Sequence, residues 1–224
     1  MIVLKNINKV YKNKKIKVLK HINYRFSLGK VYSLMGPSGS GKSTLLNLLS
    51  LIDEPTSGTI VIDNNKVNYT KNNFNDNLRA QNIGIIYQDK NLLPDFTALE
   101  NVYLARLSIN NDKNRAIEEA KSMIKKVGLT NRMHHFPSEL SGGEVQRIAI
   151  SRALINSPKI ILADELTGSL DHKNSKNIFD ILIKLKNKNR LIIYATHNRY
   201  FANMADCKIE LNDGKMKAIN GKFK

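Results

Sequence analysis

The chain has little of several features that define whole classes of protein. Its 224 residues include one cysteine, Cys207, which excludes an internal disulfide and fits a reducing compartment. No apolar run approaches the ~20 residues that a membrane-spanning helix needs. The N-terminus has a strand-like pattern in place of a basic segment followed by a signal-peptide core. We therefore expect a soluble, cytoplasmic chain. If it drives transport, another polypeptide must supply the membrane path.

Acidic residues are also scarce. The chain has 19 Asp and Glu against 36 Lys and Arg, a formal net charge of +17. The lysines are spread along the chain among many asparagines and do not form one stripe, so we predict no nucleic-acid partner. The densest basic patch, residues 12–17, falls in a predicted hairpin. It is either a solvated loop, which we favour, or a surface facing anionic headgroups.

A phosphate-binding pattern stands near the N-terminal third of the chain. Residues 36–44 read Gly-Pro-Ser-Gly-Ser-Gly-Lys-Ser-Thr and fit G-x-x-x-x-G-K-[ST]. A strand pattern at 30–35 precedes them and a helix pattern at 43–49 follows, which is the context that the motif requires. A glycine-rich turn without function is the competing interpretation. The predicted nucleotide-binding residues are Gly36, Ser38, Gly39, Ser40, Gly41, Lys42, Ser43 and Thr44.

Two acidic residues and a histidine follow fully apolar runs, which are typical of buried parallel strands. Residues 160–163 lead into Asp164 and Glu165, and residues 191–195 lead into Thr196 and His197. Ligands in such sheets lie beyond the carboxyl ends of the strands. We therefore predict that Asp164 holds Mg²⁺ with Ser43, that Glu165 is the general base, and that His197 senses a γ-phosphate. Considered alone, the acidic pair could equally be a solvated turn.

A second anion site is predicted at residues 140–147, Leu-Ser-Gly-Gly-Glu-Val-Gln-Arg. Ser141, Gly142 and Gly143 precede a helix predicted at 144–154. Free N–H groups at a helix start attract anions, but nothing nearby in sequence supplies one. The chain thus carries a complete phosphate cradle and a spare phosphate clamp, and this combination favours a pair of chains.

Together these motifs resemble the ATPase subunit of ABC transporters, in order and spacing, over essentially the whole chain. The resemblance implies a P-loop NTPase (RecA-like) α/β core with an antiparallel β subdomain and a helical subdomain. It also implies that ATP and Mg²⁺ bind, and that two copies pair head to tail. The resemblance implies that Tyr11 stacks on adenine and that Gln88 links Mg²⁺ and the attacking water to a membrane partner. It implies that Ser141 and Gly143 bind the γ-phosphate of the ATP held by the opposite chain. Asp171 would lie at the dimer interface, and His197 would contact the γ-phosphate. An aromatic residue at the end of a strand can also be core, so Tyr11 retains both interpretations.

Domain organisation follows from the same patterns. We predict one domain over residues 1–224. In it, residues 1–88 and 151–224 form the nucleotide-binding core with the β subdomain, and residues 89–150 form the helical subdomain. The elements predicted in these regions are strands at 1–10, 24–27 and 59–63, helices at 98–107, 113–127 and 174–186, and a hairpin at 212–214.

The stretch 91–102, which includes Leu-Leu-Pro-Asp-Phe-Thr, most closely resembles the ATPase of the lipoprotein-releasing system (LolD type). That family implies integral-membrane partner subunits, lipoprotein cargo, and a peripheral location on the cytoplasmic face of the inner membrane. Macrolide-efflux and cell-division (FtsE type) ATPases share most of the motifs, so efflux or nucleotide-gated regulation of a cell-wall partner stays open. Leu166 departs from the proline usual after the catalytic acid, and Asn198 from the usual Asp after the histidine. Leu166 is expected to loosen the turn that holds Glu165.

Overall fold

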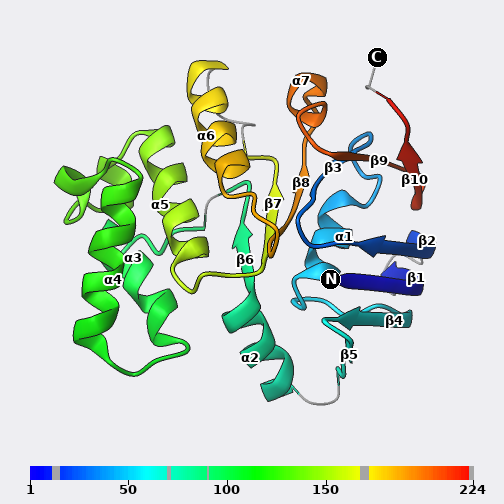
Figure 1. The fold of residues 1–224 in the computed structure, drawn as a ribbon, viewed down its shortest axis with the longest axis horizontal. Helices are drawn as coiled ribbons and strands as arrows, with labels where there is room; N and C mark the ends of the chain where they lie inside the picture. Colours follow the sequence, from blue (N-terminus) through cyan, green and yellow to red (C-terminus); the bar gives the residue numbers. More distant parts are fainter. Residues whose placement is uncertain (12–15, 70–71, 90, 167–171, 222–224) are drawn as a thin grey trace.

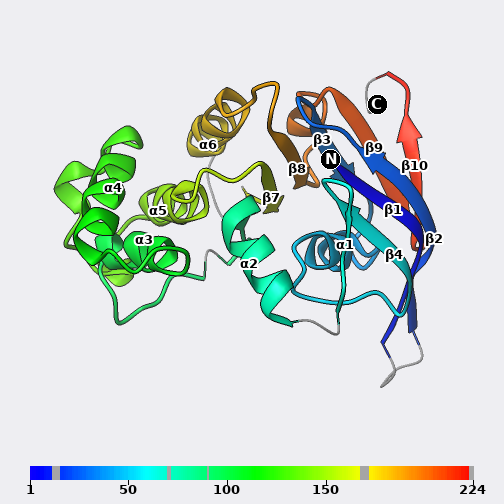
Figure 2. The same cartoon turned by 60° about the horizontal axis from the view of Figure 1, so that its bottom comes forward.

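A computed structural model describes residues 1–11, 16–69, 72–89, 91–166 and 172–221, without the side chains of 72–74 and 172–174. It contains two sheets, helices that cover the larger sheet, and a separate group of helices (Figures 1 and 2). Within these residues no helix has both the length and the apolar character needed to cross a membrane.

The larger sheet is mostly parallel. Its six strands lie in the order β10-β9-β3-β8-β7-β6, and β10 alone runs antiparallel to its neighbour. Alternate residues of the central strands face opposite sides, and both sides are buried, as expected for a parallel sheet covered on both faces. The strands are β3 (Val31–Met35), β6 (Ile83–Ile86), β7 (Ile160–Asp164), β8 (Leu191–Ala195), β9 (Cys207–Asn212) and β10 (Lys215–Ile219).

The smaller sheet is antiparallel, in the order β2-β1-β4-β5. Its apolar face and one face of the larger sheet enclose the helix α1 (Lys42–Leu49), so that Leu45, Leu48 and Leu49 are fully buried. The strands are β1 (Ile2–Tyr11), β2 (Ile16–Phe26), β4 (Ser57–Ile62) and β5 (Asn65–Lys66). This sheet corresponds to the predicted β subdomain.

Of the remaining helices, α2 (Asn72–Asn82) packs on the α1 side of the larger sheet through Leu78, and the others lie on the opposite side or in the separate group. In Figure 1, α3 (Ala98–Leu107) and α4 (Lys113–Lys126) form the green group at the left, and α5 (Gly142–Leu154) lies between them and the sheet. One side of α5 packs on α3 and α4 through Ile148, and its C-terminal part packs on the sheet through Ile150. Helix α5, which begins at the predicted second anion site, therefore crosses residue 150, the predicted boundary between the helical subdomain and the nucleotide-binding core. The other described helices are α6 (His172–Lys184), α7 (Arg199–Ala202) and the 3₁₀ turns Thr130–Arg132 and Pro137–Glu139.

Most predicted elements are present. The strand at 191–195 and the helix at 98–107 have the predicted bounds, and the hairpin at 212–214 joins β9 to β10. The prediction for 24–27 was too short, because β2 begins at Ile16 and pairs with β1 throughout. The helix α2 was missed entirely. Its sequence, NNFNDNLRAQN, is almost wholly polar and has no apolar period to reveal it.

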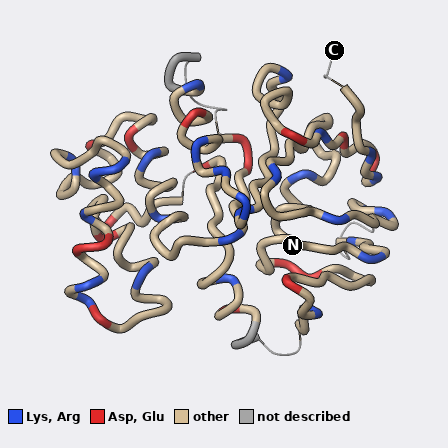
Figure 3. Tube along the Cα trace, viewed as in Figure 1, with Lys and Arg blue, Asp and Glu red and all other residues tan. Residues whose placement is uncertain are grey.

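Basic side chains are distributed over the whole molecule. Figure 3 shows Lys and Arg on both sheets and on the separate helices, with Asp and Glu between them. Residues 12–15 of the basic patch at 12–17 lie outside the described residues, so the two interpretations of the patch stay open. The expected absence of a nucleic-acid partner stays a prediction.

Candidate nucleotide site

Four strand ends meet at one edge of the larger sheet. The register pairs Leu34 of β3 with Ala195 of β8, Asp164 of β7 with Ala195, and Ala163 of β7 with Ile86 of β6. The segments that follow these strands therefore emerge together. They carry the phosphate loop after β3, Gln88 after β6, Glu165 after β7 and His197 after β8, which is the expected place for a ligand in such a sheet.

A cavity of about 450 Å³ lies at this edge. It is lined by Val18, Ser38, Gly39, Gly41, Lys42, Ser43, Thr44, Gln88, Glu165 and His197. Nine of these ten residues were predicted as site residues. The tenth, Val18, lies on β2 and was missed, because nothing in a strand pattern shows which side chain will contact the phosphate loop.

The phosphate loop leaves the start of α1 open. Gly41 is the N-cap of α1 with φ 103°, a left-handed conformation that disfavours other residues, and it provides no side chain to cap the helix. A Cβ atom there would lie 3.1 Å from the Val18 carbonyl oxygen. The first N–H groups of α1 therefore keep their hydrogen-bonding capacity for a ligand, and the helix dipole favours an anion at this end.

Lys42 supplies the positive charge of the cavity. Its ammonium donates hydrogen bonds to the carbonyl oxygens of Gly36 (2.9 Å) and Pro37 (3.1 Å). Burial lowers its pKa, and the negative charges of Glu165 and Asp164 act in the opposite direction. A phosphate oxygen could take the place of one of these carbonyl oxygens and would give the ammonium a negatively charged acceptor instead of a neutral one.

Asp164 has an unused ligand position. Its Oδ1 atom is buried and has no hydrogen-bond partner, an arrangement that is costly unless a ligand completes it. Burial raises the pKa of this carboxyl above its ordinary value, a hydrogen bond with Ser43 lowers it, and the charge of Glu165 raises it. A cation beside Oδ1 would satisfy the buried oxygen and favour the ionised form.

These residues fit Mg²⁺. No cluster of three or more His, Cys, Asp and Glu side chains suited to a metal occurs in the part of the chain that the structure describes. Mg²⁺ does not need such a cage, because it usually takes one or two protein oxygens and completes its shell with waters and substrate phosphates. The Ser43 hydroxyl and the unpartnered Asp164 oxygen are oxygen ligands of this kind.

Glu165 has an unusual backbone. Its φ is 43°, in the left-handed region that a non-glycine residue seldom adopts, and its N–H donates to the Ala195 carbonyl oxygen (3.2 Å). Its Oε1 contacts the Nε2 atom of His197. Leu166, expected to loosen this turn, has its side chain buried in the core on one face of the sheet, and the loosening itself stays a prediction. Whether turnover changes stays a prediction.

Asn198 also has a defined structural role beside the histidine. Its side chain caps the short helix α7 by accepting from the N–H groups of Tyr200 (2.9 Å) and Phe201 (3.4 Å). An Asp at this position would cap in the same way. The departure from the usual residue therefore leaves the turn after His197 with its cap.

The signature turn lies elsewhere. Ser141, Gly142 and Gly143 open α5 and do not line the cavity. Ser141 and Glu144 form a capping box, in which the Ser141 hydroxyl accepts from the Glu144 N–H (3.4 Å) and the Glu144 carboxylate accepts from the Ser141 N–H (2.8 Å). Glu144 also pairs with the Arg132 guanidinium at 3.0 Å.

Tyr11, the predicted adenine platform, does not line the cavity either. Tyr11 lies at the end of β1 with 42 % of its surface exposed, so it is not a core residue. Its role as an adenine platform stays a prediction. Asp171 lies outside the described residues, as does the rest of the segment 167–171.

A strand, a glycine-rich loop, and a helix bearing Lys42 and Ser43, with a carboxylate at the end of a neighbouring strand, define a P-loop nucleoside triphosphatase. Residues 19–168 match the family described as "ABC transporter". The chain belongs to this family, and it is an ATP-binding subunit that hydrolyses ATP.

Known proteins similar to this chain support the same class. The lipoprotein-releasing system ATP-binding protein LolD of Rickettsia bellii is 44% identical over 96% of this chain and 97% of its own length. The uncharacterised ABC transporter ATP-binding protein YvrO of Bacillus subtilis is 41% identical over 96% and 95%. A dimeric post-hydrolysis structure of the ATP-binding cassette MJ0796, bound to ADP and Pi, has a TM-score of 0.89 and 38% identity, covering 99% of this chain and 100% of that one.

Proposed function

We propose that this chain is the ATPase subunit of a lipoprotein-releasing ABC transporter and lies on the cytoplasmic face of the inner membrane. The observation that carries the cargo assignment is the 44% identity to a LolD protein over nearly the full length of both chains. The stretch 91–102 supports it, because the sequence resemblance to the lipoprotein-releasing ATPases is most distinctive there.

In this proposal the cavity holds the triphosphate of ATP. The open N–H groups of α1 and the Lys42 ammonium bind the β- and γ-phosphates. Ser43, Asp164 and Gln88 hold Mg²⁺, which neutralises charge on the phosphate oxygens when it is bound. Tyr11 stacks on the adenine.

Hydrolysis then needs a positioned water. Glu165 accepts a proton from this water as its oxygen bonds to the γ-phosphorus and the bond to the β-phosphate oxygen breaks. His197 lines the same cavity in contact with the Glu165 carboxylate, and in this proposal it contacts the γ-phosphate. The strained backbone at Glu165 fixes the base in advance, so little reorganisation is needed during the reaction.

The signature turn binds the ATP of a second copy. Gly142 and Gly143 are the first residues of α5, and no carbonyl one turn earlier in the helix can accept from their N–H groups. They face no phosphate in their own chain. In a head-to-tail pair they and Ser141 would complete the partner's site, with Asp171 at the interface. The dimeric state of the similar cassette supports this arrangement.

The membrane subunits dock beside Gln88. A groove of about 290 Å³ lies between α2, β6 and α5, and its lining includes Arg79, Tyr87 and Arg152. Leu93 and Phe96, in the adjoining stretch, are 45% and 38% exposed. These exposed apolar side chains give a partner helix a surface to bury, and the groove gives it polar contacts. Movement at Gln88 would then connect the ATP site to the membrane path.

The test is lipoprotein release. The chain is co-purified with its integral-membrane subunits, reconstituted in proteoliposomes with a lipidated protein, and supplied with ATP. Release that requires ATP, and that a complex carrying Lys42→Ala does not perform, is the expected result. Active ATP hydrolysis without release would overturn the cargo assignment and favour nucleotide-gated regulation of another partner.

A further inference from the structure

The ring of Tyr11 is held by two charged side chains. Its hydroxyl donates a hydrogen bond to Oδ2 of Asp53 (3.1 Å). The Lys9 ammonium lies 4.9 Å from the ring centroid, which is within the range of a cation–π interaction. The ring is thus fixed at its tip and covered on one face, although much of its surface is exposed.

Asp53 is itself fixed. Its Oδ1 accepts from the Lys9 ammonium (2.5 Å) and from the backbone N–H of Glu54 (2.8 Å). Lys9 also donates to the Glu54 carbonyl oxygen (2.8 Å), and only 7% of its surface is exposed. A buried ammonium is retained only where it is paired in this way. Lys9, Asp53 and Tyr11 therefore form one connected network.

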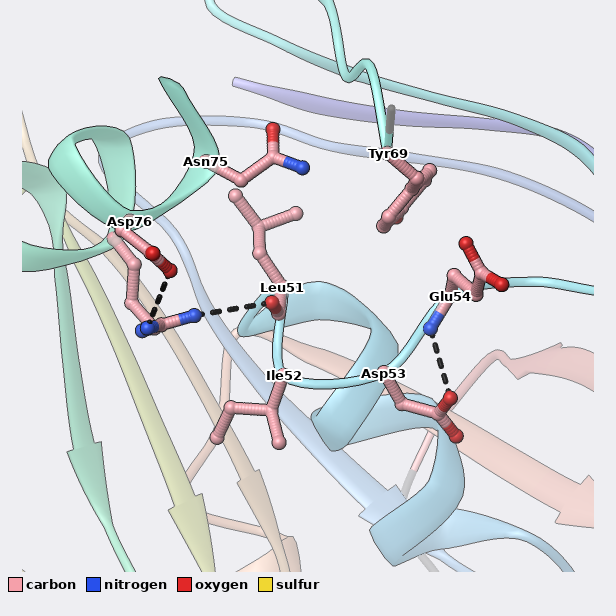
Figure 4. A pocket seen from close by; sticks show the side chains of 8 residues that line it. Leu51, Ile52, Asp53, Glu54, Tyr69, Asn75 and Asp76 are labelled. Atoms are coloured by element: carbon pink, nitrogen blue, oxygen red, sulfur yellow. Dashed lines mark hydrogen bonds and ion pairs between the residues drawn. The ribbon is translucent and has the colours of Figure 1, made fainter. Parts of the chain in front are cut away.

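This network joins the ring to the loop that follows α1, the helix whose first turn belongs to the phosphate loop motif. Figure 4 shows Asp53 on the loop that follows α1, with its carboxylate bonded to the Glu54 N–H. The same helix begins at Lys42, and its eight residues span about 12 Å. One end of α1 thus carries the phosphate-binding groups, and the other end anchors the ring predicted to bind adenine.

We propose that Asp53 and Lys9 are positioning residues for adenine. Asp53 holds the Tyr11 ring by its hydroxyl, and Lys9 covers one face, so that the opposite face receives the base. This inference rests on the proposed role of Tyr11. It predicts an effect on the affinity for ATP and not on the chemistry at the γ-phosphate, because neither residue lines the cavity that contains Glu165.

Two conservative variants test the proposal. Tyr11→Phe keeps the ring and removes the hydroxyl, and Asp53→Asn keeps the size of the side chain and removes the charge. Each is expected to raise the Kd for ATP about 3- to 10-fold, the effect of one hydrogen bond, and to leave kcat within about twofold. The double variant should bind ATP no more weakly than the worse single variant, because both changes act on the one hydrogen bond between the Tyr11 hydroxyl and residue 53.

Inorganic tripolyphosphate separates positioning from general damage. It occupies the phosphate cradle without a base, so its Kd should not change in either variant. Binding is measured by calorimetry, and thermal unfolding confirms the fold. Asp76→Asn is the matched control, because Asp76 lines the same pocket in Figure 4 but pairs with Arg79 (2.7 Å) and should leave both affinities unchanged.

Tyr11→Ala distinguishes the possible failures. If it weakens ATP binding while Tyr11→Phe and Asp53→Asn do not, the positioning role is wrong and the adenine platform stands. If Tyr11→Ala itself leaves ATP binding unchanged, the platform is wrong and the positioning role falls with it. Equal loss of ATP and tripolyphosphate binding in Asp53→Asn would also overturn the inference.

Discussion

The two glycine-containing helix starts of this molecule differ in what they leave open. At α1, the N-cap is Gly41, which has no side chain to bond the first turn, and the buried Lys42 lies in a cavity with Glu165 and His197. At α5, the N-cap is Ser141, whose hydroxyl and the Glu144 carboxylate occupy two N–H groups reciprocally. The first start is a cavity-lined anion site, and the second is partly satisfied by its own side chains.

The difference fits the proposed role of the signature turn in a pair of chains. An uncapped helix start retains its donors for a ligand, whereas a capped one keeps its shape without a ligand. The turn at Ser141 can therefore stay folded in an unpaired chain and still present the N–H groups of Gly142 and Gly143. In the proposed pair, the phosphate loop binds the phosphates of ATP in its own chain, and the signature turn is a preformed surface for the ATP of the other chain. The following predictions test this division of roles.

The largest effect is expected at the cradle. Glu165→Gln removes the proposed general base and should lower kcat by at least ~10²-fold. ATP should still bind, so an ATP-bound dimer should accumulate in size-exclusion chromatography. Glu118→Gln, on the exposed helix α4, is the control and should retain turnover. Near-normal hydrolysis by Glu165→Gln would show that another group acts as the base.

The next largest effect is expected when chains with a damaged phosphate loop are mixed with chains with a damaged signature turn. Lys42→Ala damages the cradle, and Ser141→Arg damages the signature turn. Neither chain alone can form an intact composite site, but a mixed pair contains one intact site out of two. ATP should therefore produce a dimer in the mixture and in neither single variant, as measured by light scattering. If the mixture stays monomeric, the two halves do not combine as proposed, or pairing requires two bound ATP molecules.

A smaller effect is expected from the cap of α5. Ser141→Ala removes the hydroxyl that accepts from the Glu144 N–H and should lower the free energy of unfolding by about 1 kcal/mol. The measurement is denaturant unfolding. Ser108→Ala, at the end of α3, removes a hydroxyl that donates to the Ala105 carbonyl oxygen and should cost less. Equal losses in the two variants would argue that the cap has no special weight.

The smallest effect is a dependence on pH. Hydrogen bonds with Ser141, and then the Arg132 guanidinium, lower the pKa of Glu144 from 4.5 to about 2. Because the pKa is lower in the folded state, the contribution to stability is complete above about pH 4.5 and is lost as the pH falls toward 2. The stability difference between the native chain and Glu144→Gln should therefore shrink on acidification. A constant difference would contradict this.

Much of the fold followed from local patterns. The run at 191–195 is apolar throughout and the helix at 98–107 has apolar residues at helical spacing, so both had the predicted bounds. The nucleotide-site motifs needed only strand ends and a glycine loop, which a parallel sheet brings to one edge. The parts that were missed depend on contacts distant in sequence. The helix α2 is stabilised by contacts such as the Arg79 hydrogen bond to the Leu51 carbonyl oxygen (3.2 Å), which no local pattern contains.

The details of the site show the same limit. The left-handed backbone of Glu165 and the buried packing of Leu166 arise from the sheet around them, not from their own residue types. The burial of Leu166 in the core could not be predicted from its position after Glu165 in the sequence. Likewise, Asp53 and Tyr11 are 42 residues apart, and only the folded chain brings the carboxylate to the hydroxyl.

The absence of a side chain at Gly84 has a mechanical consequence. A Cβ atom there would lie 2.4 Å from the Ala153 carbonyl oxygen, so β6 and α5 are in direct backbone contact. The strand leads to Gln88, and the helix begins after Ser141. At Gly84 no layer of side chains separates the strand from the helix. Any side chain larger than hydrogen at Gly84 would force β6 and α5 apart, so their close packing depends on this glycine.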